Sequence, residues 1–234
     1  MTLEEILSAG FAELGLSPDP AALPRFRQYY ETLSETNKVM NLTAISGEDE
    51  SATKHFLDSA APLLLTPMAG KTVIDVGSGA GFPGLPLRIL EPELRLTLLD
   101  AQQKRVGFLT EVCAALGFSD VQCVHARAEE LSARRERYDF ALARAVARLN
   151  VLAELCLPYV KVGGAFLALK GPGASEELAE AGRAVKTLGA EVEDLFAYDV
   201  PGGELRHSIV VLRKIAPTPK QYPRRFAQIK KSPL

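Results

Sequence analysis

One glycine-rich stretch limits what this chain can fold into more than any other part of its sequence. From Val73 to Leu87 the chain reads VIDVGSGAGFPGLPL: an apolar, β-branched run, three glycines on alternate positions, and a new apolar period after Pro83. Glycine allows the dihedral angles of a tight turn and, lacking a Cβ, lets a ligand approach the main chain closely. Proline suits the first position of a helix. The stretch therefore predicts a strand, a turn and a helix, the nucleotide-binding arrangement of an open α/β sheet.

Two kinds of ligand fit such a turn, and a purely structural glycine turn is the third interpretation. Gly79 to Gly84 matches Gly-x-Gly-x-x-Gly, the dinucleotide fingerprint, which is weakly specific on its own. Asp75 lies just before the first glycine, where its charge would repel a pyrophosphate. S-adenosylmethionine is cationic at its sulfonium and ammonium groups, so a carboxylate beneath it is favourable. The pattern Asp-x-Gly-x-Gly-x-Gly resembles the first motif of class I methyltransferases.

The rest of the chain shows first helical and then alternating patterns. Three amphipathic helices are expected at Leu3–Leu14, Ala21–Met40 and Glu48–Leu65. Alternating strands and helices then predict a doubly wound α/β fold, and two final strands without a helix between them predict an antiparallel hairpin, as in class I methyltransferases. Strands are expected at Val73–Val76, Leu94–Asp100, Val121–His125, Tyr138–Ala143, Gly164–Leu169, Glu191–Val200 and His207–Lys214, and helices at Leu85–Leu90, Gln102–Leu116, Asn150–Tyr159 and Ala174–Leu188.

These patterns divide the chain into three parts. We expect a helical N-terminal subdomain over residues 1–66, a core with a seven-stranded sheet over 67–216, and a C-terminal tail over 217–234. The tail holds five Lys or Arg residues and no acid, although the net charge of the chain is only −2. A basic segment with interleaved aromatic residues can hold phosphates and stack on bases, and the alternative is a solvated, frayed terminus.

Composition predicts a globular protein without a membrane anchor. Apolar residues make up 47% and charged residues 24% of the 234, and no apolar run is long enough to span a bilayer. The acidic first residues do not form a secretion signal, so a cytoplasmic location is expected. The three cysteines lack Cys-x-x-Cys spacing, which predicts buried free thiols and no metal site.

Three strand ends carry residues that face the predicted turn. Asp100 closes the second strand, where an acid can accept hydrogen bonds from both ribose hydroxyls or, alternatively, cap the helix from Gln102. Ala128 and Glu129 follow the third strand, where backbone groups can contact an adenine; the alternative for Glu129 is to stabilise a helix N-terminus. Arg144 ends the fourth strand, where it can hold a phosphate, the cofactor carboxylate or a base edge, with a surface salt bridge as the alternative.

The fourth strand also argues against two other chemistries. It ends Ala143-Arg144-Ala145. Methyltransferases of adenine and cytosine amino groups resemble one another in an Asn/Asp-Pro-Pro-aromatic tetrad at this place, and the tetrad is absent here. Cytosine-C5 enzymes need a cysteine nucleophile, whereas Cys156 lies inside an apolar helix. Arg144 itself cannot act as a general base because its pKa is too high.

Longer motifs together resemble one family over nearly the whole chain. The chain is similar to the RsmG (formerly GidB) enzymes, bacterial methyltransferases of N7 of one guanine in small-subunit (16S) ribosomal RNA. The Gly-Phe-Pro-Gly-x-Pro run is more specific for this family than the glycines alone. The C-terminal tail departs from the family pattern at Phe226–Ile229, and this departure affects the RNA contacts expected of the tail. The motifs are GSGAGFPGLPL, NKVMNLTAI (Asn37–Ile45), HFLDS (His55–Ser59), LLDAQQKRVGFL (Leu98–Leu109), HARAEE, ARA, LKGP (Leu169–Pro172) and YPRR (Tyr222–Arg225).

The resemblance implies a methyl donor, a partner and a set of site residues. The donor would be S-adenosyl-L-methionine, and the partner 16S ribosomal RNA in the small ribosomal subunit or its assembly intermediate, bound by a monomer. The implied cofactor-binding residues are Gly77, Phe82, Asp100, Ala101, Gln102, Ala128, Glu129 and Arg144, with Asp75 and Gly79 as neighbours. The implied RNA-binding residues are Arg127, Arg144, Lys170, Arg224 and Arg225, and the implied catalytic residues are Arg144 and Lys170.

The target atom determines the expected mechanism. Guanine N7 has an in-plane lone pair and no proton, so methyl transfer to it requires no general base. Rate would come from placing N7 in line with the methyl–sulfur bond and from tolerating the cationic product. We therefore expect Arg144→Ala and Lys170→Ala to lower activity with little change in fold. The alternatives are a methyltransferase of another RNA or a small molecule, and a non-catalytic RNA-binding or ribosome-assembly protein.

Overall fold

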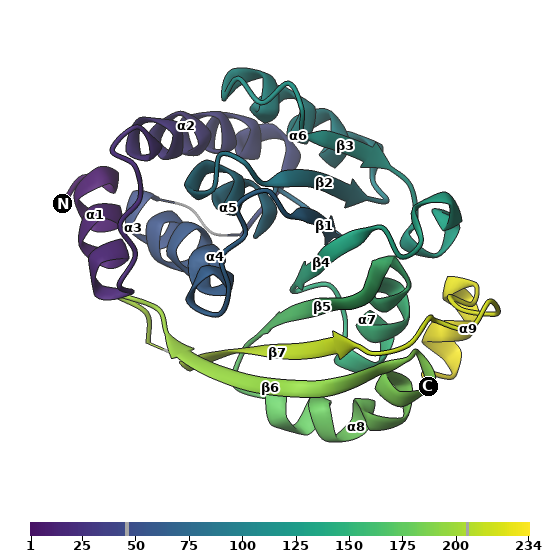
Figure 1. The fold of residues 1–234 in the computed structure, drawn as a ribbon. Coiled ribbons are helices and arrows are strands. Elements are labelled where there is room, and N and C mark those ends of the chain that lie inside the picture. The colour runs from purple at the N-terminus through teal and green to yellow at the C-terminus, as the bar shows by residue number, and fades with distance from the viewer. Residues whose placement is uncertain (45–46, 205) are drawn as a thin grey trace.

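One seven-stranded sheet forms the centre of this computed structural model, which describes residues 1–44, 47–204 and 206–234. The strand order is β3-β2-β1-β4-β5-β7-β6. All neighbours from β3 to β5 are parallel, whereas β7 runs antiparallel to both β5 and β6 (Figure 1). The predicted terminal hairpin is therefore confirmed. The strands are β1 (Thr72–Val76), β2 (Arg95–Asp100), β3 (Gln122–His125), β4 (Tyr138–Arg144), β5 (Val160–Lys170), β6 (Ala190–Asp199) and β7 (Arg206–Lys214).

Helices cover both faces of the sheet, which explains why its central strands are continuous apolar runs. Parallel strands packed on both sides read as unbroken stretches of Val, Ile and Leu, and Val73 and Ile74 on opposite faces of β1 are both fully buried. Helices α1, α2, α5 and α6 pack on one face, and α7, α8 and α9 on the other. The helices are α1 (Leu3–Glu13), α2 (Ala22–Met40), α3 (Glu48–Glu50), α4 (Asp58–Ala60), α5 (Gly84–Leu90), α6 (Gln103–Ala115), α7 (Leu149–Cys156), α8 (Ala174–Thr187) and α9 (Phe226–Lys231).

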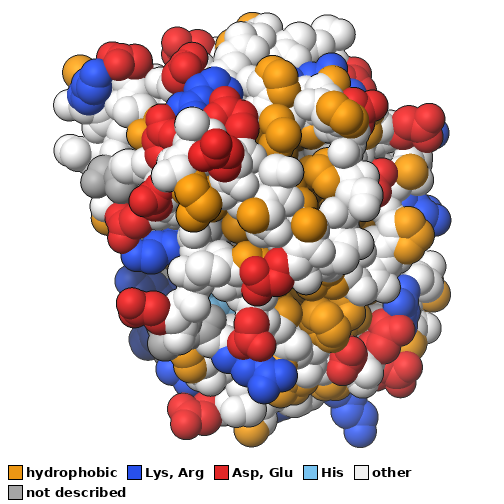
Figure 2. All heavy atoms as spheres, turned by 90° about the vertical axis from the view of Figure 1, so that its left-hand side faces the viewer, with side chains coloured by type: hydrophobic (Ala, Val, Ile, Leu, Met, Phe, Trp, Pro, Cys, Tyr) orange, Lys and Arg blue, Asp and Glu red, His pale blue; other side chains and the backbone are white. Residues whose placement is uncertain are grey.

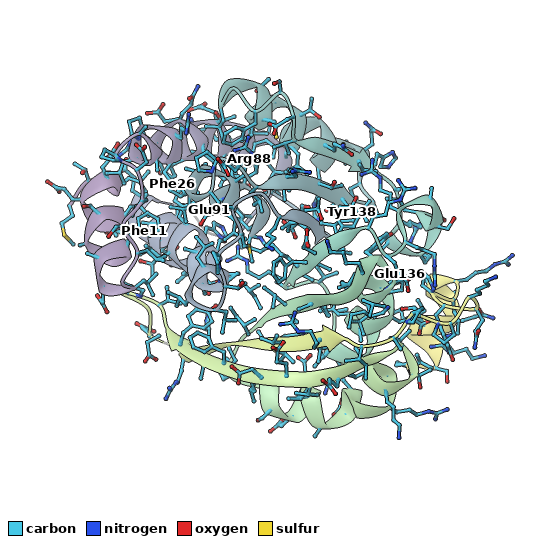
Figure 3. The ribbon with its side chains drawn as sticks, viewed as in Figure 1. Phe11, Phe26, Arg88, Glu91, Glu136 and Tyr138 are labelled. Carbon is cyan, nitrogen blue, oxygen red and sulfur yellow. The ribbon has the colours of Figure 1, made fainter. Side chains whose placement is uncertain are left out.

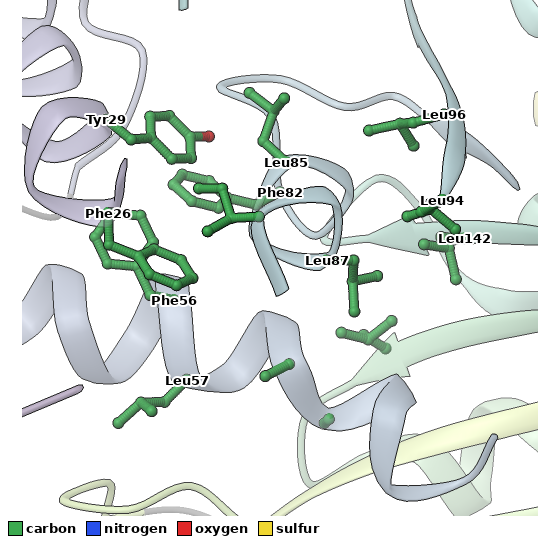
Figure 4. Packing of buried hydrophobic residues seen from close by; sticks show 14 of the residues in the cluster. Phe26, Tyr29, Phe56, Leu57, Phe82, Leu85, Leu87, Leu94, Leu96 and Leu142 are labelled. Carbon is green, nitrogen blue, oxygen red and sulfur yellow. The ribbon is translucent and has the colours of Figure 1, made fainter. Parts of the chain in front are cut away.

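The N-terminal helices share their core with the sheet. Phe26 and Tyr29 from α2 pack around Phe82 and Leu85, which follow β1 (Figure 4). Phe56 joins them from the third helical segment, residues 48–64. The ring centroids of Phe26 and Phe56 are 5.0 Å apart, and those of Tyr29 and Phe82 are 5.4 Å apart. The boundary at residue 66 stays a prediction, but one apolar cluster extends across it.

The third predicted helix, Glu48–Leu65, is helical but not uniformly α-helical. It begins as α3, widens to a π-helix over Ser51–Leu57, continues as α4 and ends as a 3₁₀ turn over Ala61–Leu64. A π-helix rotates the residues after it relative to an α-helix and is frequent at functional sites. His55 and Asp58 are both buried there. Ile45, the last residue of the NKVMNLTAI motif, lies outside the described residues.

Four helix starts differ by one residue from the sequence prediction: α2 begins at Ala22, α5 at Gly84, α6 at Gln103 and α7 at Leu149. Pro83 precedes helix α5 as its N-cap, after a cis peptide bond with Phe82, rather than occupying the first helical position. Helix α6 begins at Gln103, and its N-cap is Gln102. The terminal residue of a helix is set by local turn geometry, which the sequence pattern does not fix to the residue. The order of the elements is unchanged by these shifts.

The C-terminal segment is ordered, so the frayed-terminus alternative is wrong. Helix α9 buries Ile229 against α7. Arg224 forms an ion pair with Glu154, a residue of α7 with no exposed surface, at 2.6 Å between Nη2 and Oε2. Glu136, labelled beside the yellow C-terminal segment in Figure 3, accepts a hydrogen bond of 2.8 Å from the Thr218 N–H. The buried Glu154 therefore holds Arg224 in place just before α9 begins.

Two predictions from composition can be compared with the described part of the chain. No helix there combines the length and apolar character needed to cross a bilayer. All three cysteines are free thiols; Cys113 and Cys156 are buried as predicted, whereas Cys123 is half-buried. The Sγ atoms of Cys113 and Cys123 are 3.8 Å apart.

We expect Arg224→Met to lower the free energy of unfolding by about 3 kcal/mol, because it leaves the buried Glu154 carboxylate without its partner. Urea unfolding followed by circular dichroism measures the change. Arg225→Met is the matched control, since Arg225 is the exposed neighbour of Arg224. Equal stability of both variants would contradict a structural role for the ion pair.

Candidate active site

The predicted site residues gather at one edge of the sheet. The carboxyl ends of β3, β2, β1, β4 and β5 lie side by side there, in that order. The chain order reverses between β1 and β4, and ligands of open α/β sheets bind in the crevice at such a switch point. Asp100, the glycine turn, Arg144 and Lys170 are therefore neighbours along this edge.

The glycines of the turn serve different purposes. Gly77, Gly79 and Gly81 all have positive φ angles, of 75°, 59° and 103°. A Cβ on Gly81 would lie 2.5 Å from both Leu85 and the Tyr29 hydroxyl, so this glycine is needed for packing. A Cβ on Gly79 would meet only the Gly77 carbonyl oxygen, at 3.9 Å. The turn is therefore tightly supported at Gly81 and open at Gly79.

Asp75 lies beneath the turn with one carboxylate oxygen unpaired. Its Oδ2 accepts a hydrogen bond of 2.9 Å from the Gly84 N–H, while Oδ1 is buried and has no partner among the described residues. Burial raises the pKa of Asp75 to about 7, against the Gly84 N–H and the charge of Arg144, which lower it. An unpaired buried carboxylate is stabilised by a proton or a nearby cation. This environment suits a cationic ligand such as a sulfonium compound.

Asp100 connects the glycine turn to the end of β2. Its Oδ2 accepts a hydrogen bond of 3.0 Å from Gly79, and its Oδ1 accepts one of 2.8 Å from Gln102. Each carboxylate oxygen has a second lone pair, so Asp100 can still accept hydroxyl groups. The alternative role as the cap of α6 is wrong, because Gln102 occupies that position.

The other predicted cofactor residues lie at the adjacent strand ends. Ala101 and Gln102 are exposed after β2, and Ala101 accepts a hydrogen bond from His125 at the end of β3. Ala128 and Glu129 are half-buried in a short 3₁₀ turn after β3, where the Ala128 carbonyl accepts a hydrogen bond from Tyr159. The structure thus brings these residues to the edge that holds Asp100.

A cavity of about 1020 Å³ lies on the other side of the switch point, beside β4 and β5. The predicted Arg144 and Lys170 line it, whereas the glycine turn and Asp100 do not. Its walls come from the helical segment at residues 49–58, the β4–α7 segment, the end of β5 and the β6–β7 hairpin. Figure 2 views the molecule from the side of α1 and shows acidic and basic side chains interspersed with apolar ones on that face.

Arg144 is held by several groups from the third helical segment. Its Nη1 donates to Asp58 Oδ2 at 2.7 Å and to the Lys54 carbonyl at 2.8 Å. Its Nη2 lies 3.0 Å from His55 Nδ1, and its guanidinium stands over the Phe82 ring, 5.1 Å from the centroid. The predicted surface salt bridge is therefore a partly buried network, because the Arg144 side chain is only 14% exposed.

The protonation state of His55 follows from its partners. Arginine has no acceptor, so Nδ1 must accept from Arg144, and Nε2 must carry the proton that is donated to Thr43 Oγ1 at 2.9 Å. Burial, and then the charge of Arg144, lower the pKa of His55 to about 3. The ring is therefore neutral, and it stacks on Phe82 with 4.2 Å between ring centroids.

Asp58 is the acceptor that the whole network shares. Besides Arg144 it accepts from the Tyr198 hydroxyl at 2.8 Å and from His207 Nδ1 at 2.7 Å, both on the terminal hairpin. Burial raises the pKa of Asp58, but the hydrogen bonds from His207 and Arg144 outweigh it and lower the pKa. The hydrogen bond to Asp58 raises the pKa of His207.

Sequence reasoning did not assign roles to His55, Asp58, Tyr198 or His207. Two signals were available: both His55 and Asp58 belong to the HFLDS motif, and they are three residues apart in an apolar helix, which places them on one face of that helix. The network also changes an expectation for Arg144→Ala. Removing one partner of a buried ion pair is strongly destabilising, so this substitution should reduce stability as well as activity.

The remaining basic residues divide into engaged and exposed ones. Lys170 Nζ donates to the Ala147 carbonyl at 2.7 Å and pairs with Glu177 at 2.8 Å, and Arg224 is held by Glu154. Arg127 and Arg225 are exposed. The structure therefore gives Lys170 and Arg224 protein partners, and RNA contact by any of these residues stays a prediction.

The fold is that of a class I S-adenosylmethionine-dependent methyltransferase. It is defined by the strand order, by the glycine turn next to the buried Asp75, and by Asp100 at the end of β2. A family model described as rRNA small subunit methyltransferase G (GidB) matches residues 22–204. The chain belongs to this family of small-subunit ribosomal RNA methyltransferases. It is 46% identical to Ribosomal RNA small subunit methyltransferase G of Alkaliphilus oremlandii over 100% of both chains, and 44% identical to the protein of that name from Pelotomaculum thermopropionicum over 99% of both.

Solved structures with lower identity share the fold. A SAM dependent methyltransferase from Aquifex aeolicus has a TM-score of 0.53 at 20% identity, covering 70% of this chain and 93% of that chain. The M. jannaschii protein TYW2, in complex with AdoMet, has a TM-score of 0.55 at 11% identity, covering 68% of this chain and 75% of that chain. At these identities the likeness establishes the class of fold.

We expect Asp75→Asn to remove a pH dependence of stability. In the wild type the pKa is about 7 in the folded state against 3.8 as the ordinary value, so the folded state keeps a proton that the unfolded state has lost. This contribution to stability is therefore fully present below about pH 4 and is lost as pH rises to about 7, so the variant should gain about 4 kcal/mol relative to wild type over this range. Urea unfolding across this range measures it.

Asp139→Asn is the matched control, at the opposite end of the sheet. Burial raises the pKa of Asp139, but hydrogen bonds from Lys161 and Thr72 outweigh it and lower the pKa to about 2. Its stabilising contribution is present above the ordinary pKa of 3.8 and is lost as pH falls through about 2. Asp139→Asn should thus destabilise by a constant amount between about pH 5 and pH 8. A constant difference for Asp75→Asn as well would refute the buried-acid interpretation.

Proposed function

We propose that the chain transfers a methyl group from S-adenosylmethionine to N7 of a guanine in 16S ribosomal RNA. Family membership supports a small-subunit ribosomal RNA substrate. The choice of N7 rests on one observation: His55 and Asp58, the buried titratable groups that contact Arg144 beside the cavity, both have lowered pKa values and are therefore weak bases at neutral pH. His55 Nδ1 accepts from Arg144, and Asp58 already accepts from three donors. An acceptor nitrogen that carries no proton fits this site.

The cofactor is assigned to the edge formed by β1, β2 and β3. Asp100, which accepts from the Gly79 N–H, would also accept the ribose hydroxyls, and the Ala128 and Glu129 turn would bound the adenine. Asp75, whose Oδ1 has no partner among the described residues, lies against Gly84 of the same glycine-rich turn. Gly77, Phe82, Ala101 and Gln102 complete the edge. S-adenosylmethionine supplies an electrophilic methyl group when bound, and the protein residues orient it and exclude water.

The guanine is assigned to the cavity beside β4 and β5. The cavity adjoins the glycine turn through the β4–α7 segment, so donor and acceptor sides meet at the switch point. The fixed positive charge of Arg144 over Phe82 would hold an electron-rich group such as a phosphate or a carbonyl oxygen. Catalysis then consists of orientation in a pocket whose polar groups are already fixed.

RNA contacts outside the cavity are assigned to exposed basic residues. Arg127 follows β3 at the cofactor edge, and Arg225 precedes α9. Because these side chains are exposed, they can neutralise phosphates, and their contribution should weaken as salt concentration rises. We propose a monomer that acts on the small ribosomal subunit or its assembly intermediate.

The experiment is methyl transfer from labelled S-adenosylmethionine to small ribosomal subunits from a strain that lacks this protein, followed by nucleoside analysis. We expect the label in 7-methylguanosine. Asp100→Asn should weaken S-adenosylmethionine binding about tenfold. The substitution replaces one carboxylate oxygen, an acceptor for the ribose hydroxyls, by an NH₂ group, which is a donor. Calorimetry measures this binding without RNA.

Each other result has a distinct meaning. Label in another nucleoside would contradict the N7 assignment and leave a ribosomal RNA methyltransferase. Label only in another RNA or a small molecule would overturn the substrate assignment. Failure of the wild-type protein to bind S-adenosylmethionine would overturn the enzyme proposal and favour a non-catalytic RNA-binding or assembly protein.

A further inference from the structure

The segment between β4 and α7, residues 145–148, lies along the border of the glycine turn and the cavity and contacts both. Ala145 has a positive φ of 56°, which is uncommon for a residue with a side chain. Val146 packs on the turn, since a Cβ added to Gly77 would lie 2.7 Å from its Cγ2. All four residues of the segment also line the cavity. We call residues 145–148 the dividing segment.

Two side chains fix the dividing segment from the far side. Lys170, at the end of β5, donates to the Ala147 carbonyl at 2.7 Å. Glu177, on α8, accepts from Lys170 Nζ at 2.8 Å and from the Leu149 N–H at 2.7 Å, both with its Oε2. Lys170 is only 9% exposed and Glu177 23% exposed. One carboxylate oxygen therefore holds both the start of α7 and the lysine that holds Ala147.

The side chains of the dividing segment do not themselves explain its position. Ala145, Val146 and Ala147 offer no polar groups, and Arg148 pairs with Glu180 at the surface, where both side chains are more than half exposed. Helix α7 receives no side-chain cap from its own N-cap residue, Arg148. The Leu149 N–H is instead capped by Glu177, from another helix.

We propose that Glu177 is a positioning residue that acts through Lys170 to set the boundary between the methyl donor and the acceptor base. The proposal rests on the proposed function of the site, and it gives Lys170 an indirect role in place of contact with substrate. In Glu177→Gln the buried ammonium of Lys170 loses its counterion, and the Leu149 N–H keeps only a neutral, weaker acceptor. The dividing segment then moves away from Gly77, and donor and acceptor lose their alignment.

The test compares Glu177→Gln with Glu180→Gln, which removes an exposed carboxylate three residues further along the same helix. Hydrogen exchange of the purified protein reports on the dividing segment, and methyl transfer reports on function. We expect Glu177→Gln to speed exchange of the Leu149 amide about tenfold and to lower kcat about tenfold. The KM for S-adenosylmethionine should change less than about threefold, because Asp100 and the glycine turn are untouched. Glu180→Gln should change none of these.

A second comparison separates positioning from general destabilisation. Lys170→Met and the double variant with Glu177→Gln should both match the kcat of Glu177→Gln, since the two residues act in one chain of contacts. Effects on kcat that multiply in the double variant would overturn the proposal. So would faster exchange across the whole sheet, unchanged exchange at Leu149, or faster exchange there with wild-type kcat.

The outcome is distinguishable from failure of the proposed function. If the wild-type protein does not methylate ribosomal RNA, exchange at Leu149 still shows whether Glu177 holds the dividing segment. Normal exchange in Glu177→Gln together with wild-type turnover on RNA would overturn the positioning role and leave the proposed function intact.

Discussion

The buried ion pair between Asp58 and Arg144 is the interaction on which the rest of this site depends. It joins the third helical segment to the end of β4, and through Tyr198 and His207 it also joins the terminal hairpin. Removing two charges from water is costly, and only several good hydrogen bonds offset that cost. Asp58 receives such bonds from the end of β4 and from the terminal hairpin, two parts of the chain that are far from it in sequence. The cavity walls therefore form together when the tertiary structure forms.

The glycine turn shows how one motif meets two physical demands. Gly81 and Gly84 allow close packing, since a Cβ on either would lie within 3 Å of neighbouring side chains. Gly79 instead leaves open space, and the buried Asp75, which accepts from the Gly84 N–H, has one oxygen without a partner among the described residues. The motif is thus a rigid support with one open position. A ligand that brings positive charge near Asp75 reduces the cost of burying this carboxylate.

Much of the fold could be predicted from sequence because its signals are local. Apolar runs marked the strands, the missing helix before β7 marked the hairpin, and Asp75 and Asp100 were found because they sit at strand ends. The Asp58 network and the Glu177 contacts could not be predicted, because their partners are brought together only by the sheet order. The alternative of a frayed C-terminal tail was wrong for the same reason, because nothing near Arg224 in sequence indicates its buried partner Glu154. Pro83 lies one residue before the helix and not at its first position, because turn geometry sets where α5 begins.

The ion pair between Glu154 and Arg224 has a consequence for the order in which the protein matures during synthesis. Glu154 lies in α7, in the middle of the sheet domain, whereas Arg224 is translated after every strand of the sheet. A nascent chain that has completed β7 therefore still has an uncompensated carboxylate on the face of α7 that α9 later covers. This face stays hydrated until the basic segment leaves the ribosome. Docking of α9 then adds Ile229 to the apolar cluster that packs on α7.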